Sequence, residues 1–191
     1  NGGRFGDNAV LYRMNAQSNL IEQAFVKSGV PYRVFGGMRF YDRKEIKDIT
    51  SYMAVINNNN DSLRMRRIIN EPKRGIGKTS LDKIQAISEQ TGIPMYQIIK
   101  EADQYGLSRV YSNAQGFIEV IEDLISKKDE YTITELIKHT LKETGYTKAL
   151  EDENSIEAEN RIENLEEFLT VAVQFEEEEA DNDLSTFLEG I

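Results

Sequence analysis

The chain has 191 residues and a formal net charge of −10, with 39% apolar residues, 29% charged residues, one His and no Cys. This composition excludes disulfides, thiol chemistry and a wholly disordered chain, and it leaves little for a soft-metal site. No apolar run approaches the roughly 18 residues of a membrane span, and NGGRFGDN at the N-terminus lacks the apolar stretch of a signal peptide, so we expect a cytoplasmic protein without a membrane partner.

The first 40 residues predict a β-α-β unit. AVLYR (9–13) predicts a short buried strand, residues 17–28 carry apolar side chains at helical spacing, and residues 32–35 predict a second strand. Two strands do not form a stable sheet by themselves. We therefore expect that this segment belongs to a larger α/β domain or that its missing strands come from elsewhere. The exposed edge of such a truncated sheet would invite pairing with another copy.

From Asp42 onward the apolar period is helical, which predicts a mainly α remainder. Asp42 and Glu45 have the spacing of a capping box at the start of a helix. The NNNND run (57–61) predicts a connector, and a short helix should follow it before Pro72. The apolar stripe of the first helix comprises Ile46, Ile49, Met53 and Ile56.

Helical stripes continue as far as residue 175. Thr79 and Asp82 are spaced to cap the next helix, which should end at Thr91–Gly92. The acidic run EEEEADND (176–183) predicts a solvated helix end or a loop. Further stripes predict helices at 95–102, 114–127, 133–143 and 158–175.

The stretch EPKRGIGKTS (71–80) ends like a phosphate-binding loop for ATP. That loop has the pattern G-x-x-x-x-G-K-[ST], and its first glycine corresponds here to Pro72, which has no N–H to offer a phosphate. The preceding IIN gives weak support for the strand that should feed such a loop. A small ATP-binding enzyme is therefore the least favoured hypothesis, and we expect no thermal stabilisation by nucleotide.

The same stretch has the features of a helix-hairpin-helix turn. Gly75 and Gly77 flank Ile76 and would let the backbone approach a partner closely. The N–H groups of Gly77, Lys78 and Thr79 would lie at a helix N-terminus, which favours anions. This pattern predicts binding to the DNA backbone without sequence preference. The alternative is a plain glycine turn between packed helices, with solvated basic side chains.

Charge is distributed unevenly along the chain. Residues 1–100 carry 16 Lys and Arg against 9 Asp and Glu, whereas residues 151–191 carry 1 against 15. Residues 61–80 alone hold six basic side chains and two acidic ones. Such asymmetry indicates an anionic partner for the basic part.

Two other stretches combine residues suited to nucleic acid. YRMNAQ (12–17) places Arg13 and Asn15 on one side of a strand end, although ordinary surface polarity explains this equally well. FGGMRFYDRKEIKD (35–48) mixes aromatic and basic residues that could stack on bases and contact phosphates, although packing is the commoner role of such aromatics. No nucleophile with its base is evident, and His139 lies in a helical stripe without triad partners.

Three long motifs, in this order and spacing, resemble the UvrD/PcrA/Rep family of superfamily 1 ATP-dependent DNA helicases. They are NAVLYRMNAQSNLIEQAF, PYRVFGGMRFYDRKEIKDITSYM and IINEPKRGIGKTSLDKI. The resemblance implies that residues 1–55 are the opening part of the RecA-like α/β motor domain 2A. Residues 56–191 would then be the helical 2B domain, which the family inserts into 2A, so the implied fold is mainly α with a short β-α-β piece in front.

The resemblance also implies roles for particular residues. Arg13, Asn15 and Lys47 match family positions that contact the translocating single strand. Asn19 stands where family members often have Arg, which puts any contact of that arginine in doubt. The family's GIG element holds the duplex ahead of the fork, and with the basic residues beside it the implied duplex-binding set is Lys73, Arg74, Gly75, Ile76, Gly77, Lys78 and Thr79.

The ATP-site motifs of the family are absent from these residues. We therefore expect no cofactor in this fragment, with ATP and Mg acting in a longer parent protein, a 3'-5' helicase of DNA replication and repair. The fragment itself should bind duplex DNA through residues 74–79, and residues 12–15 should contact single strand in the parent. The alternative is a regulatory or protein-interaction module whose acidic segment 151–191 docks a basic partner.

Overall fold

The computed structural model describes residues 4–12, 17–34, 39–178 and 183–191. Over these ranges the chain is predominantly helical and contains no strand, so the prediction of a mainly α fold is confirmed. Short 3-10 turns occur at Phe5–Asp7 (η1) and Phe40–Asp42 (η3). The α-helices are α1 (Ser18–Lys27), α2 (Lys44–Asn57), α3 (Ser62–Ile68), α4 (Lys78–Thr91), α5 (Met95–Lys100), α6 (Ser108–Lys127), α7 (Ile133–Glu143), α8 (Tyr146–Glu153), α9 (Ile156–Glu178) and α10 (Leu184–Glu189).

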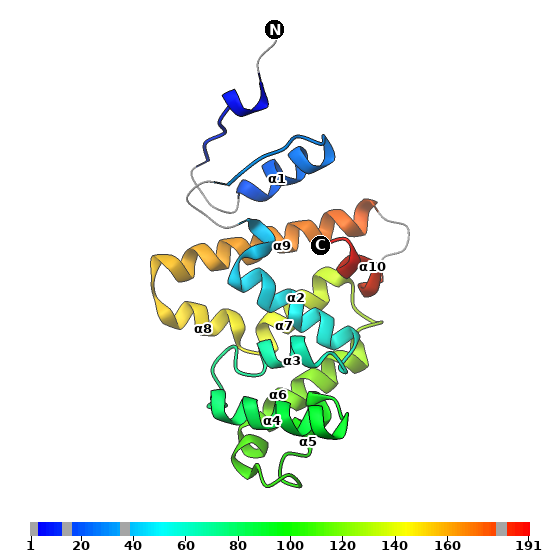
Figure 1. Cartoon of the computed structure of the whole chain (residues 1–191). Coiled ribbons are helices and arrows are strands. Elements are labelled where there is room, and N and C mark those ends of the chain that lie inside the picture. The colour runs from blue at the N-terminus through cyan, green and yellow to red at the C-terminus, as the bar shows by residue number, and fades with distance from the viewer. Residues whose placement is uncertain (1–3, 13–16, 35–38, 179–182) are drawn as a thin grey trace.

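Helix α2 runs through the middle of the molecule, and its neighbours are arranged around it (Figure 1). α1 and the N-terminal segment lie at one end, next to α9, whereas α4 and α5 lie at the opposite end. The predicted stripe of α2 is fully buried, which confirms it as the core face of that helix. Other large buried side chains come from α3, α9 and α10, including Met65, Ile68, Phe168 and Phe187.

The two predicted strands are not present in the described residues. Residues 9–12 and 32–34 form no strand, and Arg13 and Phe35, at the ends of the predictions, lie outside the described ranges. A strand exists only where a neighbour accepts and donates its backbone hydrogen bonds. No described segment pairs with either stretch, whereas the helix predicted between them is confirmed as α1.

Helix α1 faces the rest of the protein with its polar side. Ser18 Oγ accepts a hydrogen bond from Arg43 Nη2 (2.6 Å), and Asn19 Nδ2 donates to Glu167 Oε1 on α9 (3.1 Å). In contrast, Leu20 and Val26 are 53% and 67% exposed. A helix on a protein surface normally buries its apolar stripe, so the orientation of α1 is inverted.

The capping box predicted from Asp42 and Glu45 is wrong. α2 begins at Lys44, and the Glu45 carboxylate accepts a hydrogen bond from Asn164 Nδ2 on α9 at 2.6 Å. Asp42 belongs to η3 and forms an ion pair with Lys47 (2.8 Å). Local spacing assigned both carboxylates to a helix cap. In the structure, Glu45 instead binds a residue distant in the chain, and Asp42 binds a lysine five residues later.

Three stretches of helix escape the sequence pattern: α8, α10 and the first turns of α6. The short α10 buries only Leu184 and Phe187 of its six residues. α8 was not predicted, because only Tyr146 and Leu150 of its eight residues are buried. α6 begins at Ser108, six residues before the predicted start, since its first turns carry mostly polar side chains. Among the described helices, none is both long and apolar enough to cross a bilayer.

Candidate nucleic-acid interface

The turn between α3 and α4 carries the predicted glycine element. Asp61 caps the start of α3 by accepting a hydrogen bond from the N–H of Arg64 (2.9 Å). At the end of this short helix, Ile68 and Ile69 are buried in the core. The chain then turns, and α4 begins at Lys78. A helix therefore leads into the loop, whereas an ATP-binding loop of the G-x-x-x-x-G-K-[ST] kind follows a strand.

Gly75 gives the turn its shape. Its φ of +71° lies in the left-handed region, which strains residues with a side chain. A Cβ at this position would lie 2.9 Å from Nδ2 of Asn113, whose amide donates to the Gly75 carbonyl oxygen (3.3 Å). The next residue, Ile76, is buried in the core and anchors the loop.

Gly77 is the N-cap of α4 and is exposed, with open space where a Cβ would stand. The cap predicted from Thr79 and Asp82 is wrong, because the N-cap of α4 is Gly77, two residues before Thr79, and Asp82 forms an ion pair with Arg66 (2.7 Å). Within the described chain, the N–H groups of Gly77, Lys78 and Thr79 have no acceptor. These groups, at the positive end of a four-turn helix, form an anion-binding arrangement.

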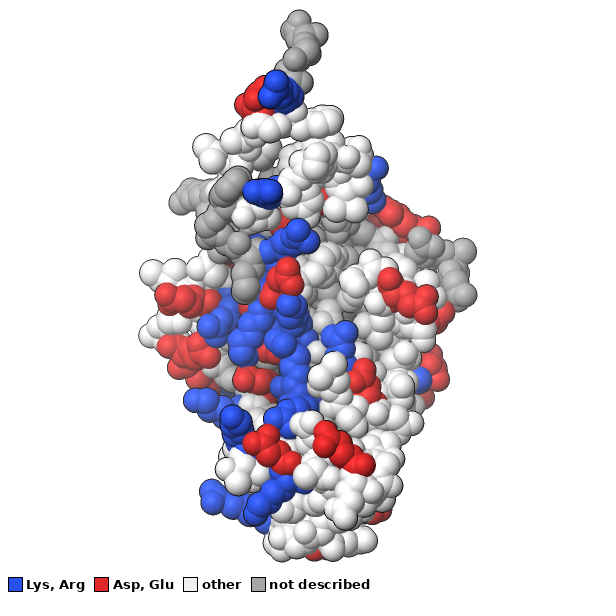
Figure 2. Space-filling view, viewed as in Figure 1, with Lys and Arg blue, Asp and Glu red and all other residues white. Residues whose placement is uncertain are grey.

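Basic side chains gather in a stripe down one face of the molecule, over the region of α2, α3 and α4 (Figure 2). Most of those on α2 and α3 are already paired: Arg66 with Asp82, and Lys47 with Asp42. Lys73 and Lys78 are exposed, and neither forms an ion pair with any described residue. Lys78 directly follows Gly77 and Lys73 lies four residues before it in the chain, so both are available to an external anion near the start of α4.

Arg74 differs from the two lysines beside it. Its guanidinium points into the protein, where Nη2 donates to Tyr52 Oη (2.9 Å) and the group lies 4.6 Å from the centre of the Phe117 ring. The ring and Arg74 also line a cavity of about 360 Å³ beneath the turn. The phosphate contact predicted for the Arg74 side chain stays a prediction. In the structure, the partners of this side chain are groups of the protein itself.

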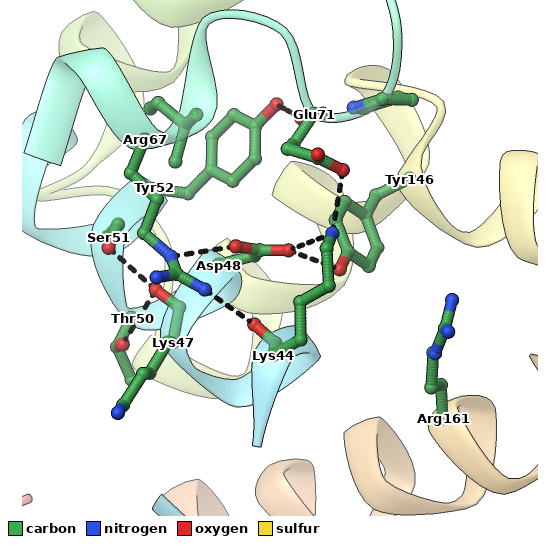
Figure 3. Close-up of polar contacts among 12 residues, drawn as sticks. Lys44, Lys47, Asp48, Thr50, Ser51, Tyr52, Arg67, Glu71, Tyr146 and Arg161 are labelled. Atoms are coloured by element: carbon green, nitrogen blue, oxygen red, sulfur yellow. Dashed lines mark hydrogen bonds and ion pairs between the residues drawn. The ribbon is translucent and has the colours of Figure 1, made fainter. Parts of the chain in front are cut away.

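A buried carboxylate, Asp48 of α2, lies among Arg67, Lys44 and Tyr146 and binds all three (Figure 3). Asp48 Oδ1 accepts from Arg67 Nε (2.7 Å), and Oδ2 accepts from Lys44 Nζ (2.9 Å) and from the Tyr146 hydroxyl (2.8 Å). Lys44 also pairs with Glu71 (2.7 Å), at the start of the turn. Burial, followed by the neighbouring Asp48 carboxylate, raises the pKa of Tyr146, which keeps the phenol as a donor.

This network joins α2, α3, α8 and the α3–α4 turn, and sequence reasoning did not single it out. Asp48 stands in the α2 sequence without any unusual neighbour, so periodicity gives no signal for it. Its only sequence signal is its position on the same helix face as the apolar core residues. A charged residue there requires partners, and only the fold shows which ones.

The predicted single-strand residues are only partly placed. Arg13 and Asn15 lie outside the described residues. Lys47 is half-exposed on α2, with its Nζ 2.8 Å from Asp42 Oδ1. Phe40, which we considered for base stacking, is fully buried against Tyr41 and is a packing residue.

Comparison with known proteins gives one consistent family. The chain matches, over residues 1–191, the family model described as UvrD-like helicase C-terminal domain. It is 44% identical over 178 residues, 93% of its length, to the ATP-dependent DNA helicase PcrA of Staphylococcus aureus. It is 45% identical over 177 residues, 92% of its length, to the protein of the same name from Staphylococcus epidermidis. In both cases it covers 24% of the relative, so it spans about a quarter of the length of the curated relatives.

Proposed function

The chain belongs to the family of UvrD-like helicase C-terminal domains, as a fragment of a PcrA-like superfamily 1 helicase, and from this premise we propose that it binds the backbone of duplex DNA through the α3–α4 turn. The observation that carries the proposal is the set of N–H groups at the start of α4 that have no acceptor among the described residues, with the exposed Lys73 and Lys78 close to them in the chain. Phosphate oxygens accept hydrogen bonds from such N–H groups. The lysines add positive charge, which attracts phosphates whatever the base sequence.

Backbone contacts of this kind predict weak, salt-dependent and sequence-independent binding. The dissociation constant should be roughly 10⁻⁴ to 10⁻⁶ M at physiological salt. Other cations of the stripe would add long-range attraction to DNA. Those in ion pairs with Asp48, Asp42 and Asp82 are held in place and partly neutralised, so they should contribute less to the affinity.

A double variant, Lys73→Ala with Lys78→Ala, tests the site directly. Titrating fluorescent duplex over a salt series should give a slope of log K against log salt that is shallower than the wild-type slope by roughly 1.8, about 0.9 for each lost phosphate contact. Since both side chains are exposed and form no ion pair with any residue that the structure describes, the melting temperature should not change.

The matched control is Lys138→Ala with Lys148→Ala, which removes the same charge from exposed positions on α7 and α8. Its salt slope should equal that of the wild type. Duplex binding that is identical in the two double variants, or wild-type binding with no salt slope, contradicts the proposal.

We further propose that residues 1–55 contribute to a RecA-like motor domain of a longer protein, with residues 56–191 as the 2B domain. The proposal is supported by the inverted α1, whose exposed Leu20 and Val26 form an apolar face that more protein could cover. In that longer protein, ATP and Mg would drive 3'-5' unwinding in DNA replication or repair. Arg13, Asn15 and Lys47 would contact the translocating strand.

The longer protein and this chain should differ in two measurable ways. Amide hydrogen exchange in α1 should be slower in the longer protein, because its apolar face is covered there. ATP with Mg should raise the melting temperature of the longer protein only, since ligand binding stabilises the state that binds it. Stabilisation of this chain by ATP would instead point back to the GKTS sequence as a nucleotide site.

A protein-interaction module is the second candidate. It is favoured by Ile156, which is 75% exposed at the start of α9 and has the exposed acids Glu153 and Glu157 nearby in the chain. A basic partner with an apolar contact would suit this surface. If the wild-type chain fails to bind duplex at low salt, and Ile156→Lys abolishes capture of such a partner, this candidate replaces the first.

A further inference from the structure

Arg74 lies at the centre of the α3–α4 turn, on its inner side. Its Nη1 donates towards three backbone carbonyl oxygens, those of Ile68 (3.0 Å), Ile69 (3.0 Å) and Pro72 (3.2 Å). Two of these carbonyls belong to the end of α3, where the last carbonyl oxygens lack partners inside the helix, and that of Ile68 also accepts the N–H of Glu71 (3.0 Å). The side chain therefore caps α3 from within the loop that follows it.

The second amino group of Arg74 is engaged as well. Nη2 donates to Tyr52 Oη (2.9 Å) and towards the Thr144 carbonyl oxygen (3.4 Å). The Tyr52 hydroxyl in turn donates to the Glu71 carbonyl oxygen at 2.5 Å. Because four of the five guanidinium N–H groups are on these two nitrogens, most of the donor capacity of Arg74 is used inside the protein.

The backbone of the turn is fixed by a second residue, Asn70. Its Oδ1 accepts the N–H of Arg74 (2.8 Å) and the N–H of Ile76 (3.2 Å). Hydrogen bonds therefore fix both the main chain and the side chain of Arg74. The N–H groups of Gly77 and Lys78, which have no acceptor in the described part of the chain, begin only three residues later. Their direction therefore depends on the hydrogen bonds that fix Arg74.

We propose that Arg74 is a positioning residue of the duplex site, which braces the turn from the inside and contacts no phosphate. This inference rests on the proposed duplex binding. Arg74 sets the direction of the N–H groups at the start of α4, whereas Lys73 and Lys78 supply the charge that meets the DNA.

The variant Arg74→Lys separates the two roles, because it keeps the positive charge and loses the planar fork of donors. Duplex affinity should fall about tenfold, while the slope of log K against log salt stays at the wild-type value. Lys78→Ala, in the same assay, should make the slope shallower by about 0.9. A phosphate contact at position 74 would give the opposite pattern, with affinity largely kept by Lys.

A measurement without DNA tests the brace independently. Amide exchange at Ile76, followed by NMR, should be faster in Arg74→Lys than in the wild type, because the turn opens more often. Tyr52→Phe removes only the hydroxyl group that accepts from Arg74 and donates to the Glu71 carbonyl oxygen, and it should give a smaller change in the same direction. It serves as the test if Arg74→Lys does not fold.

Wild-type affinity in Arg74→Lys, a changed salt slope, or unchanged exchange at Ile76 in either variant overturns the inference. Failure of the proposed function looks different. In that case the wild type does not bind duplex, while exchange at Ile76 still responds to both substitutions.

Discussion

Gly77→Asp is expected to reduce duplex binding by at least tenfold without lowering the stability of the chain. Gly77 is the N-cap of α4, with φ −78° and ψ 173°, and a Cβ there meets nothing within 4 Å. Asp is a favoured N-cap residue in this backbone conformation, so the free energy of unfolding should rise by a few tenths of a kcal/mol. The same carboxylate would occupy the free N–H groups and repel phosphate.

Fluorescence anisotropy with labelled duplex and thermal melting, on the same preparation, check both halves of this prediction. Gly77→Ala is the control, because it adds a methyl group in open space and no charge. It should bind duplex nearly as the wild type does. If Gly77→Asp and Gly77→Ala bind equally well, the start of α4 is not where the phosphate sits.

Asp48→Asn is expected to cause the largest loss of stability, about 3 kcal/mol. The Asp48 side chain is 1% exposed and accepts from Arg67, Lys44 and Tyr146. Removing one partner of a buried ion pair leaves the other charges uncompensated, which costs about 3–5 kcal/mol. Lys44 and Arg67 are 47% and 35% exposed, so water screens them and the lower end applies.

Thermal unfolding should show this loss as a melting temperature lower by about 6–12 °C for a chain of this size. Asp42→Asn is the matched control, because Asp42 also pairs with a lysine of α2 but is exposed. Its melting temperature should stay close to that of the wild type. If Asp48→Asn melts no lower than Asp42→Asn, the buried network does not hold these helices together.

These predictions divide the basic residues of the stripe into two groups. Arg67 and Arg74 use their donors inside the protein, on Asp48 and on the carbonyl oxygens of the turn. Lys73 and Lys78 have no internal partner among the described residues. The first group should therefore affect stability and geometry, and the second should affect salt-dependent affinity.

Much of this protein could be predicted from its sequence alone. Except for α8 and α10, the period of apolar residues located the helices from α2 onward, because a helix that buries one face must repeat its apolar side chains about every 3.6 residues. The glycines of the α3–α4 turn and the family resemblance were equally visible. These are local properties, carried by neighbouring residues in the chain.

Only the tertiary structure decided what individual polar side chains do. Arg74 and Lys78 look alike in sequence, yet one points under the turn and the other into water. Glu45 and Asp82 fit local caps, but Asn164 and Arg66 engage them instead. The predicted strands have no pairing partner in the described chain. The physical reason is common to all of these cases: hydrogen bonds and ion pairs depend on groups brought close by folding, and spacing along the chain does not specify those groups.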